Sequence, residues 1–441
     1  MIEEMLKKID DRSYSIGIIG LGYVGLPLLW TFYQQGFPLT GIDVDEEKIK
    51  ELKAGRSYIK HFRHDQIAEM MNSGKVDATT DFSAVSNVDA ILMCVPTPLD
   101  DHREPDMTYV ESTVKSVAKH MRKGQLLVLE STTYPGTTDE LIKPLAEQYS
   151  GLKEGEDFFL AYSPEREDPG NADFRTATIP KVVGGDGEDA QKLASAMYSQ
   201  AISEVVPVSS TRAAEATKLL ENIFRSVNIA LVNELKVVFQ KMDIDIYEVI
   251  NAAKTKPFGF MAFYPGPGLG GHCIPIDPFY LTWKAREYGI NTRFIELAGE
   301  VNTAMPDFVI ERTIEALNSK KKAVNGSRIL CLGLAYKPDV DDMRESPTFK
   351  IMDLLSHYGA EVDYHDPYVP EITPTREHAH WTGTKSVPWE ESQISGYDAV
   401  VICTNHSSID YDELMNWQDC IVDTRNALRT LLKTNGQVWK A

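Results

Sequence analysis

The chain has 441 residues, of which 43% are hydrophobic and 25% charged, and its formal net charge is -20. This length predicts two or three domains, and the composition is that of a globular protein. The negative charge argues against nucleic acid or an anionic membrane as the main partner. An anionic small molecule stays open, because backbone amides and a few local cations decide its binding.

The five cysteines, at positions 94, 273, 331, 403 and 420, form no CxxC pair. Their odd number predicts a reducing cytoplasm rather than a disulfide framework. His272 and Cys273 have no second ligand pair at zinc-like spacing, so no metal site is expected. Residues 1–13 read as a short amphipathic helix, and we expect neither a signal peptide nor a membrane span.

The first motif is a glycine-rich turn between an expected strand over 15–19 and an expected helix over 26–33. A second strand, over 39–44, carries Asp43 near its end. The bare GxGxxG pattern is weak, but strand, turn, helix, strand and acid together predict dinucleotide binding.

Each glycine of this turn has an expected task. Gly20 makes the tight turn, Gly22 lets a pyrophosphate approach, and Gly25 allows close packing of helix on strand. The helix N-terminus then faces the phosphates. Asp43 would accept from ribose hydroxyls and repel a 2′-phosphate, which favours NAD over NADP.

Further β/α units follow, and their polar loops should lie at the carboxyl edge of a sheet, where ligands bind. The expected strands are 90–95, 126–130 and 158–162, then 328–335, 361–364, 398–403 and 420–423. The predicted fold is α/β, with two Rossmann-like doubly wound domains joined by a long central helix. We expect an NAD-binding domain over 1–208, a central helical domain over 209–322 and a C-terminal domain over 323–441.

The central helix is expected over 213–242, where thirty residues contain neither Gly nor Pro. Its apolar residues form one broad stripe, which suggests a dimer surface. Lys218 and Asn222 are spaced i, i+4 and share a face roughly opposite that stripe. On spacing alone, this face is either solvated or functional.

Residues 266–273 form a glycine-dense loop that ends in Cys273, and Asp277 follows four positions later. Four glycines allow backbone to approach a ligand closely, and flanking prolines stiffen the loop. The alternative is a tight turn beside a buried structural cysteine, since free cysteine is among the most buried residue types.

Taken in order, the segments resemble the UDP-glucose/GDP-mannose dehydrogenase family over nearly the whole chain. They are GLGYVGLP, VPTP, ESTTYPGTT, SPER, the Lys218/Asn222 helix, GLGGHCIPIDP and KPDVDDMRESP. Within the family, the stretch around Cys273 is most similar to bacterial UDP-N-acetylglucosamine 6-dehydrogenases.

The resemblance implies a four-electron oxidation of a primary alcohol to a carboxylate with two NAD⁺ in succession. Lys218 and Asn222, with a water on Asp277, would stabilise the developing alkoxide. Cys273 would attack the aldehyde and pass through a thiohemiacetal to a thioester. Water activated near Glu165, Thr132 or Asp277 would hydrolyse that thioester.

The resemblance also implies binding residues. For NAD they are Gly20, Gly22, Tyr23, Val24, Gly25, Asp43, Lys48, Thr97, Thr132 and Arg344. For the UDP-sugar they are Glu165, Arg166, Lys218, Asn222, Tyr264, Gly270, Lys337 and Arg425. The expected partners are this substrate and a second copy of the chain in a homodimer, in a cytoplasmic enzyme of surface-polysaccharide synthesis.

Two departures put UDP-glucose in doubt. The UDP-glucose branch has a second acid four residues after the Glu of its SPE motif, where this chain has Pro169. It also has an Arg ahead of the cysteine loop, and none occurs between Pro257 and Cys273. We therefore expect an N-acetylated sugar as substrate, UDP-N-acetylglucosamine in the first place, with UDP-glucose and UDP-N-acetylmannosamine as alternatives. A non-catalytic nucleotide-sugar sensor is the alternative from another class.

Overall fold

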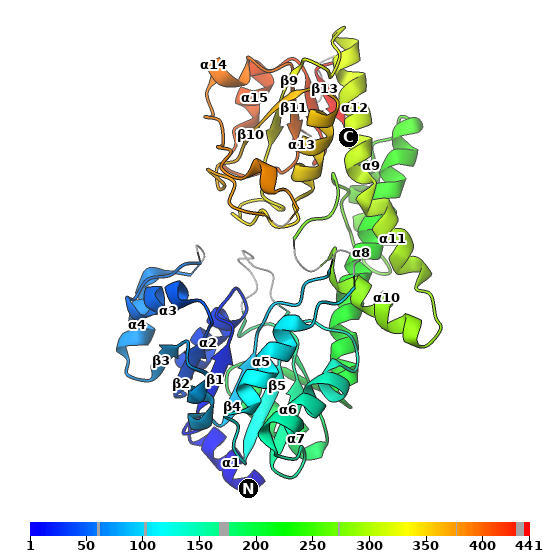
Figure 1. The fold of residues 1–441 in the computed structure, drawn as a ribbon. Helices are drawn as coiled ribbons and strands as arrows, with labels where there is room; N and C mark the ends of the chain where they lie inside the picture. Colours follow the sequence, from blue (N-terminus) through cyan, green and yellow to red (C-terminus); the bar gives the residue numbers. More distant parts are fainter. Residues whose placement is uncertain (60–61, 101–103, 167–175, 272–273, 376, 429–435) are drawn as a thin grey trace. The chain divides into compact units, whose positions relative to one another are not determined.

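The computed structural model describes residues 1–59, 62–100, 104–166, 176–271, 274–375, 377–428 and 436–441. These residues form two compact units (Figure 1). The first comprises Met1–Glu221 and Phe279–Ile290, and the second comprises Asn222–Pro278 and Asn291–Ala441. The boundary falls inside the long helix α8, Thr211–Lys241.

The first unit is built on an eight-stranded sheet in the order β3-β2-β1-β4-β5-β6-β7-β8. All neighbours are parallel except β6 and β7. The strands are β1 (Ile16–Ile19), β2 (Leu39–Ile42), β3 (Val76–Thr79), β4 (Ala90–Met93), β5 (Gln125–Leu129), β6 (Phe158–Tyr162), β7 (Lys181–Gly185) and β8 (Val205–Val208). The order 3-2-1-4-5-6 is that of a Rossmann fold, with its topological switch between β1 and β4.

Helices cover both faces of this sheet. One hydrophobic core joins it to α1, α2 and α7, and a second joins it to α5 and α6. The helices of this part are α1 (Ile2–Asp10), α2 (Gly25–Gln34), α3 (Glu46–Lys53), α4 (His64–Asn72), α5 (Thr108–Ala118), α6 (Lys143–Ser150) and α7 (Glu188–Ser199), with single turns η1 (Phe82–Asn87) and η2 (Thr137–Ile142). β1, β4, β5 and β6 are buried throughout, because both faces are covered.

The second unit contains a five-stranded parallel sheet in the order β10-β9-β11-β12-β13. Its strands are β9 (Arg328–Leu332), β10 (Glu361–His365), β11 (Ala399–Ile402), β12 (Ile421–Asp423) and β13 (Val438–Lys440). One core joins it to α12 and α13, the other to α14 and α15. This is again a doubly wound sheet, in the order 2-1-3-4-5.

Of the remaining helices, α8 to α12 form the segment between the two sheets, and those from α13 onward belong to the second sheet. They are α8, α9 (Ile246–Lys254), α10 (Asp277–Glu287), α11 (Arg293–Thr303) and α12 (Met305–Ser319), followed by α13 (Pro347–His357), η3 (Ala379–Trp381), α14 (Glu391–Ile394) and α15 (Tyr411–Trp417). The predicted fold class, two Rossmann-like domains joined by a long helix, is confirmed. None of the helices in the described parts of the chain has both the length and the apolar character to cross a bilayer.

Candidate active site

The glycine-rich turn follows β1 directly and has the geometry expected for a dinucleotide site. Gly20 has φ +87°, and a Cβ there would lie 2.3 Å from the carbonyl oxygen of Cys94. A Cβ on Gly25 would lie 1.9 Å from the carbonyl oxygen of Gly20, so helix α2 packs tightly on the turn. A Cβ on Gly22 would meet no atom within 4 Å. Gly22 therefore faces open space, as backbone that receives a pyrophosphate must.

The start of α2 is also suited to bind an anion. Its N-cap residue is Val24, and no side chain caps the helix terminus. Helix N-termini present free N–H groups and a positive partial charge, which phosphates bind well. Tyr23 and Val24 lie in this turn between Gly22 and the helix.

Asp43 comes at the carboxyl end of β2, as predicted, and is 5% exposed. Its Oδ2 accepts a hydrogen bond from the Leu21 amide at 2.8 Å and lies 3.2 Å from Lys48 Nζ. The carboxylate thus touches both the glycine turn and a partly exposed cation. This is the place of the acid that binds adenosine ribose in Rossmann sites.

Two expected cofactor threonines follow neighbouring strands. Thr97 is buried in the loop after β4, and Thr132 is half-buried in the loop after β5. Both loops therefore lie at the carboxyl edge of the sheet, beside the topological switch between β1 and β4, where Rossmann folds bind their ligands. Arg344 belongs to the second unit, where it forms an ion pair of 2.6 Å with Asp342. Its assignment to NAD stays a prediction.

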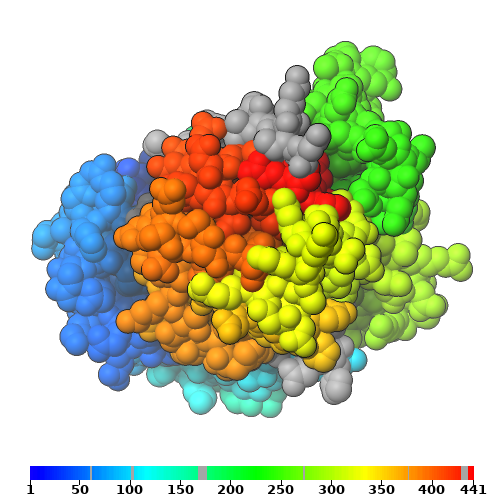
Figure 2. All heavy atoms as spheres, turned by 90° about the horizontal axis from the view of Figure 1, so that it is seen from above, coloured from blue at the N-terminus to red at the C-terminus, as the bar shows by residue number. Residues whose placement is uncertain are grey.

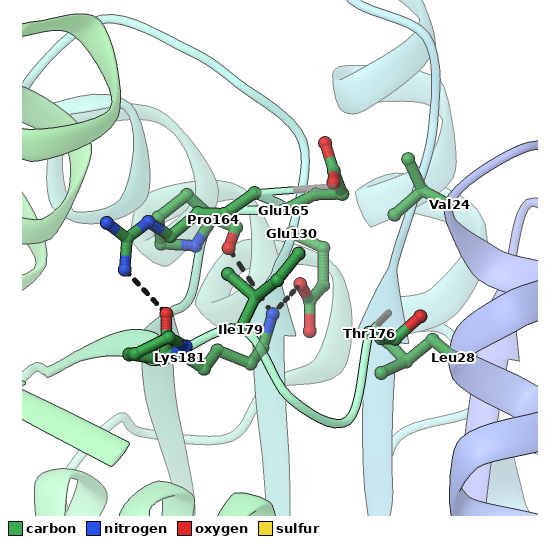
Figure 3. A pocket seen from close by; sticks show the side chains of 10 residues that line it. Val24, Leu28, Glu130, Pro164, Glu165, Thr176, Ile179 and Lys181 are labelled. Carbon is green, nitrogen blue, oxygen red and sulfur yellow. Dashed lines mark hydrogen bonds and ion pairs between the residues drawn. The ribbon is translucent and has the colours of Figure 1, made fainter. Parts of the chain in front are cut away.

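Beyond β6, the loop with Glu165 is held by a buried ion pair (Figure 3). Lys181 Nζ lies 2.7 Å from Glu130 Oε2 and donates to the Pro164 carbonyl at 3.3 Å. Arg166, from the same loop, donates to the Pro180 carbonyl at 2.5 Å. It also forms an ion pair of 2.7 Å with Glu221 of α8. The loop is therefore tied to β7 and to α8.

Glu165 itself faces a small cavity of about 30 Å³, which has room for one water molecule. Its Oε1 is buried and finds no hydrogen-bond partner among the described residues. Burial raises the pKa of Glu165, while Lys218 opposes that shift. A carboxylate with a raised pKa and an orphan oxygen beside room for water is suited to accept a proton from that water.

Lys218 binds Glu165 in two ways. Its Nζ donates to the Glu165 backbone carbonyl and lies 3.7 Å from Oε2. Lys218 is 5% exposed although it stands on the face that spacing alone could assign to solvent. The solvated-face alternative is therefore wrong for Lys218.

Asn222 lies one turn further along α8 and is also buried, at 3% exposed. Its Nδ2 donates to Asp277 Oδ2 at 2.6 Å. We expected a water on Asp277 to act beside Asn222, and the structure shows a direct bond between the two side chains. Asp277 therefore fixes the orientation of the Asn222 amide.

Cys273 and His272 lie outside the described residues, but the glycines ahead of them can be placed. A Cβ on Gly270 would lie 2.7 Å from Tyr336 Cβ, and one on Gly271 would lie 2.8 Å from the Tyr336 ring. A Cβ on Gly266 would lie 2.5 Å from Arg425 Nη1. The close approach that these glycines permit is thus to Tyr336 and Arg425 of the same unit, whereas the sequence predicted an approach to a ligand.

The other residues predicted to bind the substrate, Arg425, Lys337 and Tyr264, lie within the second unit. Arg425 donates from Nε to the Cys403 carbonyl at 2.8 Å. Lys337 Nζ lies 5.7 Å from the centroid of the Tyr336 ring. Tyr264 is 41% exposed and donates to Asn251 Oδ1 at 2.8 Å. Their roles toward a nucleotide sugar stay predictions.

Sequence reasoning missed Glu215, a fully buried acid on α8. Its carboxylate accepts from the amides of Gly136 and Thr138 at 2.7 and 2.9 Å, and from the Thr138 hydroxyl at 2.6 Å. Glu215 thus fastens the loop after β5, with Thr132, to the helix that carries Lys218. The sequence feature that could have pointed to Glu215 is its spacing, because it lies three residues before Lys218 and so shares its helix face.

Comparison with known proteins decides the family. The chain matches the NAD-binding domain of the UDP-glucose/GDP-mannose dehydrogenase family over residues 14–202, its central domain over 212–304 and its UDP-binding domain over 330–430. The chain belongs to this family. It is therefore an NAD-dependent UDP-sugar dehydrogenase, and the expected class of cofactor and substrate is confirmed.

Several relatives cover most of the chain. It is 34% identical to a UDP-N-acetyl-D-glucosamine 6-dehydrogenase of Pseudomonas aeruginosa, over 90% of this chain and 91% of the relative. It is also 34% identical to a UDP-N-acetyl-D-mannosamine dehydrogenase of Pyrococcus horikoshii, over 94% and 96%. A solved structure of the UDP-D-ManNAc dehydrogenase of Pyrococcus horikoshii superposes with a TM-score of 0.84 at 33% identity, over 94% and 96%.

Proposed function

We propose that this dehydrogenase oxidises the C6 hydroxyl of a UDP-N-acetylhexosamine, UDP-N-acetylglucosamine in the first place, to the carboxylate. The observation that carries the proposal is the buried α8 face. There Lys218 contacts Glu165, and Asn222 one turn later contacts Asp277. Each pair joins a group that can donate to an alkoxide, an ammonium or an amide, to a carboxylate that can hold it or take up a proton.

The first oxidation removes the hydroxyl proton and a hydride from C6 and leaves an aldehyde. NAD⁺, when bound, takes up one hydride in each of the two oxidations. Lys218 and Asn222 supply N–H groups for the developing negative charge on O6, and Asp277 holds the Asn222 amide in place. Gly22 and the uncapped start of α2 receive the cofactor's pyrophosphate.

The second oxidation uses Cys273 as a nucleophile. Its thiolate bonds to C6 of the aldehyde, and the oxygen gains a proton to complete a thiohemiacetal. Loss of that proton and of a second hydride from C6 gives a thioester. Water then adds to C6, the C–S bond breaks, and the thiol and a carboxylate are released. Glu165, with its raised pKa, accepts the proton of that water.

Support for an N-acetylated sugar comes from two sources. The chain lacks an Arg between Pro257 and Cys273 and has Pro169 where the UDP-glucose branch has an acid; Pro169 lies outside the described residues. The curated relatives at 34% identity act on UDP-N-acetylglucosamine and UDP-N-acetylmannosamine. UDP-N-acetylmannosamine is therefore the second candidate substrate.

The test is NADH production by the purified protein over a panel of UDP-N-acetylglucosamine, UDP-N-acetylmannosamine, UDP-N-acetylgalactosamine and UDP-glucose. We expect the highest kcat/KM with UDP-N-acetylglucosamine and two NADH for each sugar consumed. One NADH per sugar would contradict the two-step mechanism. Binding of NAD and UDP-sugar with no turnover would instead establish the sensor alternative.

The covalent step, attack of Cys273 on the aldehyde, is tested by a substitution of that cysteine. Cys273→Ser should abolish acid formation and retain UDP-sugar binding, because serine is a far weaker nucleophile at neutral pH. Cys420→Ser is a matched control, since Cys420 is a buried thiol directly before β12 in the second unit. Acid production by Cys273→Ser near the wild-type rate would refute the thioester route.

We further infer a cytoplasmic homodimer that makes uronic acids for surface polysaccharides. The described cysteines, Cys94, Cys331, Cys403 and Cys420, are all free thiols, which supports a reducing compartment. Phe224, Leu231 and Val238 recur every seven residues on α8 and are 46%, 51% and 45% exposed. A row of exposed apolar side chains on one helix face supports a subunit interface.

A further inference from the structure

A cavity of about 320 Å³ lies in the second unit, where the end of α8 meets α9, α12 and β13. In Figure 2 the red C-terminal end lies beside the yellow surface of α12, in accord with the hydrogen bond from Arg312 Nε to the Lys440 carbonyl. This volume suits a small organic molecule. Its lining includes Lys236, Ile244, Tyr247, Phe308 and Arg312, and also Asp243 and Asp245, of which Asp245 forms an ion pair of 2.5 Å with Lys440.

Lys236 is a buried cation at this cavity without an ionic partner. It is 5% exposed, and its Nζ donates to the Gly266 carbonyl at 3.1 Å. The nearby Asp423 carboxylate already accepts from the amides of Arg425, Ala427 and Leu428. Among the described residues, no carboxylate lies within ion-pair distance of Lys236. An ammonium has three N–H groups, so two remain for a ligand.

The energetics favour an anion at this position. A buried charge without a counter-charge is costly, and burial with repulsion from Arg425 lowers the pKa of Lys236 to about 7. Phe308, whose ring centroid is 5.2 Å from Lys236 Nζ, and Ile244 offer apolar surface beside the cation. A carboxylate on an apolar body matches both features.

The same cavity wall supports the start of the cysteine loop. Lys236 binds the carbonyl of Gly266, and the Tyr247 hydroxyl lies 3.1 Å from the carbonyl oxygen of Pro265. The Tyr247 hydroxyl also lies 3.2 Å from the Thr424 carbonyl, next to Arg425. A ligand on Lys236 would therefore act directly on backbone that leads to Cys273.

We propose that this cavity is an effector site for a small organic carboxylate, which binds Lys236 and thereby changes the geometry of the loop before Cys273. The effect on turnover rests on the proposed function, whereas binding at Lys236 does not. The site is separate from the dinucleotide turn and uses residues to which the oxidation mechanism assigns no role.

Binding is tested with benzoate as probe and with neutral benzamide as its isosteric control. Calorimetric titration is done on protein saturated with UDP, which fills the nucleotide site, at pH 6.5. We expect saturable benzoate binding and at least about tenfold weaker binding of benzamide, because a charge-assisted hydrogen bond is lost. Benzoate affinity should fall as the pH rises above about 7, where Lys236 loses its proton.

Two variants locate the site. Lys236→Met removes the cation, and Ile244→Trp fills the cavity from its partly exposed rim while the Lys236 ammonium is retained. Both should weaken benzoate binding at least about tenfold, the first by loss of the cation and the second by loss of space, whereas Lys241→Met, at an exposed lysine of the same helix, should not. Unchanged affinity in Lys236→Met and Ile244→Trp, or equal binding of benzamide, would overturn the proposal.

The effector role is tested by enzyme activity. Benzoate added to the UDP-sugar reaction should change kcat in the wild type and should leave kcat unchanged in Ile244→Trp. Turnover that does not respond to bound benzoate would overturn the effector role. Failure of all UDP-sugars to give NADH would instead refute the proposed function and leave the binding result intact.

Discussion

The sharpest test of how the first unit is assembled is Glu215→Gln. Glu215 Oε1 accepts from both the amide and the hydroxyl of Thr138, and Oε2 accepts from the Gly136 amide at 2.7 Å. Glutamine preserves the shape and one oxygen, so the two bonds to Thr138 can persist. Its amide nitrogen would then face the Gly136 N–H, with donor opposite donor.

The expected loss of stability follows from the number of hydrogen bonds that Glu215→Gln breaks or weakens. Burial raises the pKa of Glu215 to about 7, so the test is made above that pH, where the carboxylate is ionised. Leaving the buried Gly136 N–H without an acceptor then costs about 1–3 kcal/mol, and the two remaining bonds lose the assistance of a full charge. The free energy of unfolding of the first unit should fall by about 2–4 kcal/mol. Because the loop from Thr132 to Gly136 is then less firmly held, kcat should also fall with any active UDP-sugar.

Urea unfolding, followed by intrinsic fluorescence, measures the change. Glu234→Gln is the matched control, because Glu234 is an exposed acid on the same helix. A double-mutant cycle with Thr138→Val isolates the coupling, which should be about 1 kcal/mol or more. The reasoning is refuted if Glu215→Gln is as stable as Glu234→Gln, or if the cycle shows no coupling with Thr138.

Two further predictions concern the second unit and the subunit interface. The pKa of Lys236 is lowered to about 7, so between pH 7 and 9 the unfolded chain binds the proton that the folded chain releases, and folding gains stability as pH rises. Wild type should gain about 2 kcal/mol over Lys236→Met from pH 7 to 9 in urea unfolding; parallel pH profiles would contradict this. Leu231→Glu places a charge in the exposed apolar row of α8 and should yield monomers in light scattering, whereas Lys241→Met should not. An unchanged mass for Leu231→Glu would exclude this row as the interface.

The geometry of the dinucleotide turn, with a separate role for each of its three glycines, could be predicted from the sequence because its constraints are local. Gly20 must adopt positive φ, and Gly25 must admit the Gly20 carbonyl, within a segment of six residues. The place of Asp43 could be predicted equally well, since its position at the end of β2 follows from the strand pattern. The apolar runs likewise predicted the central strands of both sheets, but they did not predict β3, β7, β8 or β13, which lie toward the sheet edges.

The contacts around Glu165, Glu215 and Lys236 could not be predicted in this way. Glu215 bonds residues 77 and 79 positions away, and Lys236 bonds a carbonyl 30 positions away. No periodicity in the chain marks such partners, because they depend on how loops after separate strands return to α8. The apolar stripe of α8 shows the same limit, since Leu219 is buried while Leu231 is exposed.

The sequence by itself determined the family, the α/β architecture and the NAD turn, since motifs and strand patterns are properties of short segments, and it predicted which residues react. Only the tertiary structure decided that Lys218 is buried on Glu165, that Asn222 bonds Asp277 directly, and that the loop glycines are needed for packing on Tyr336 and Arg425. The physical reason is that burial and hydrogen bonding depend on neighbours in space, and a linear pattern specifies neighbours only along the chain.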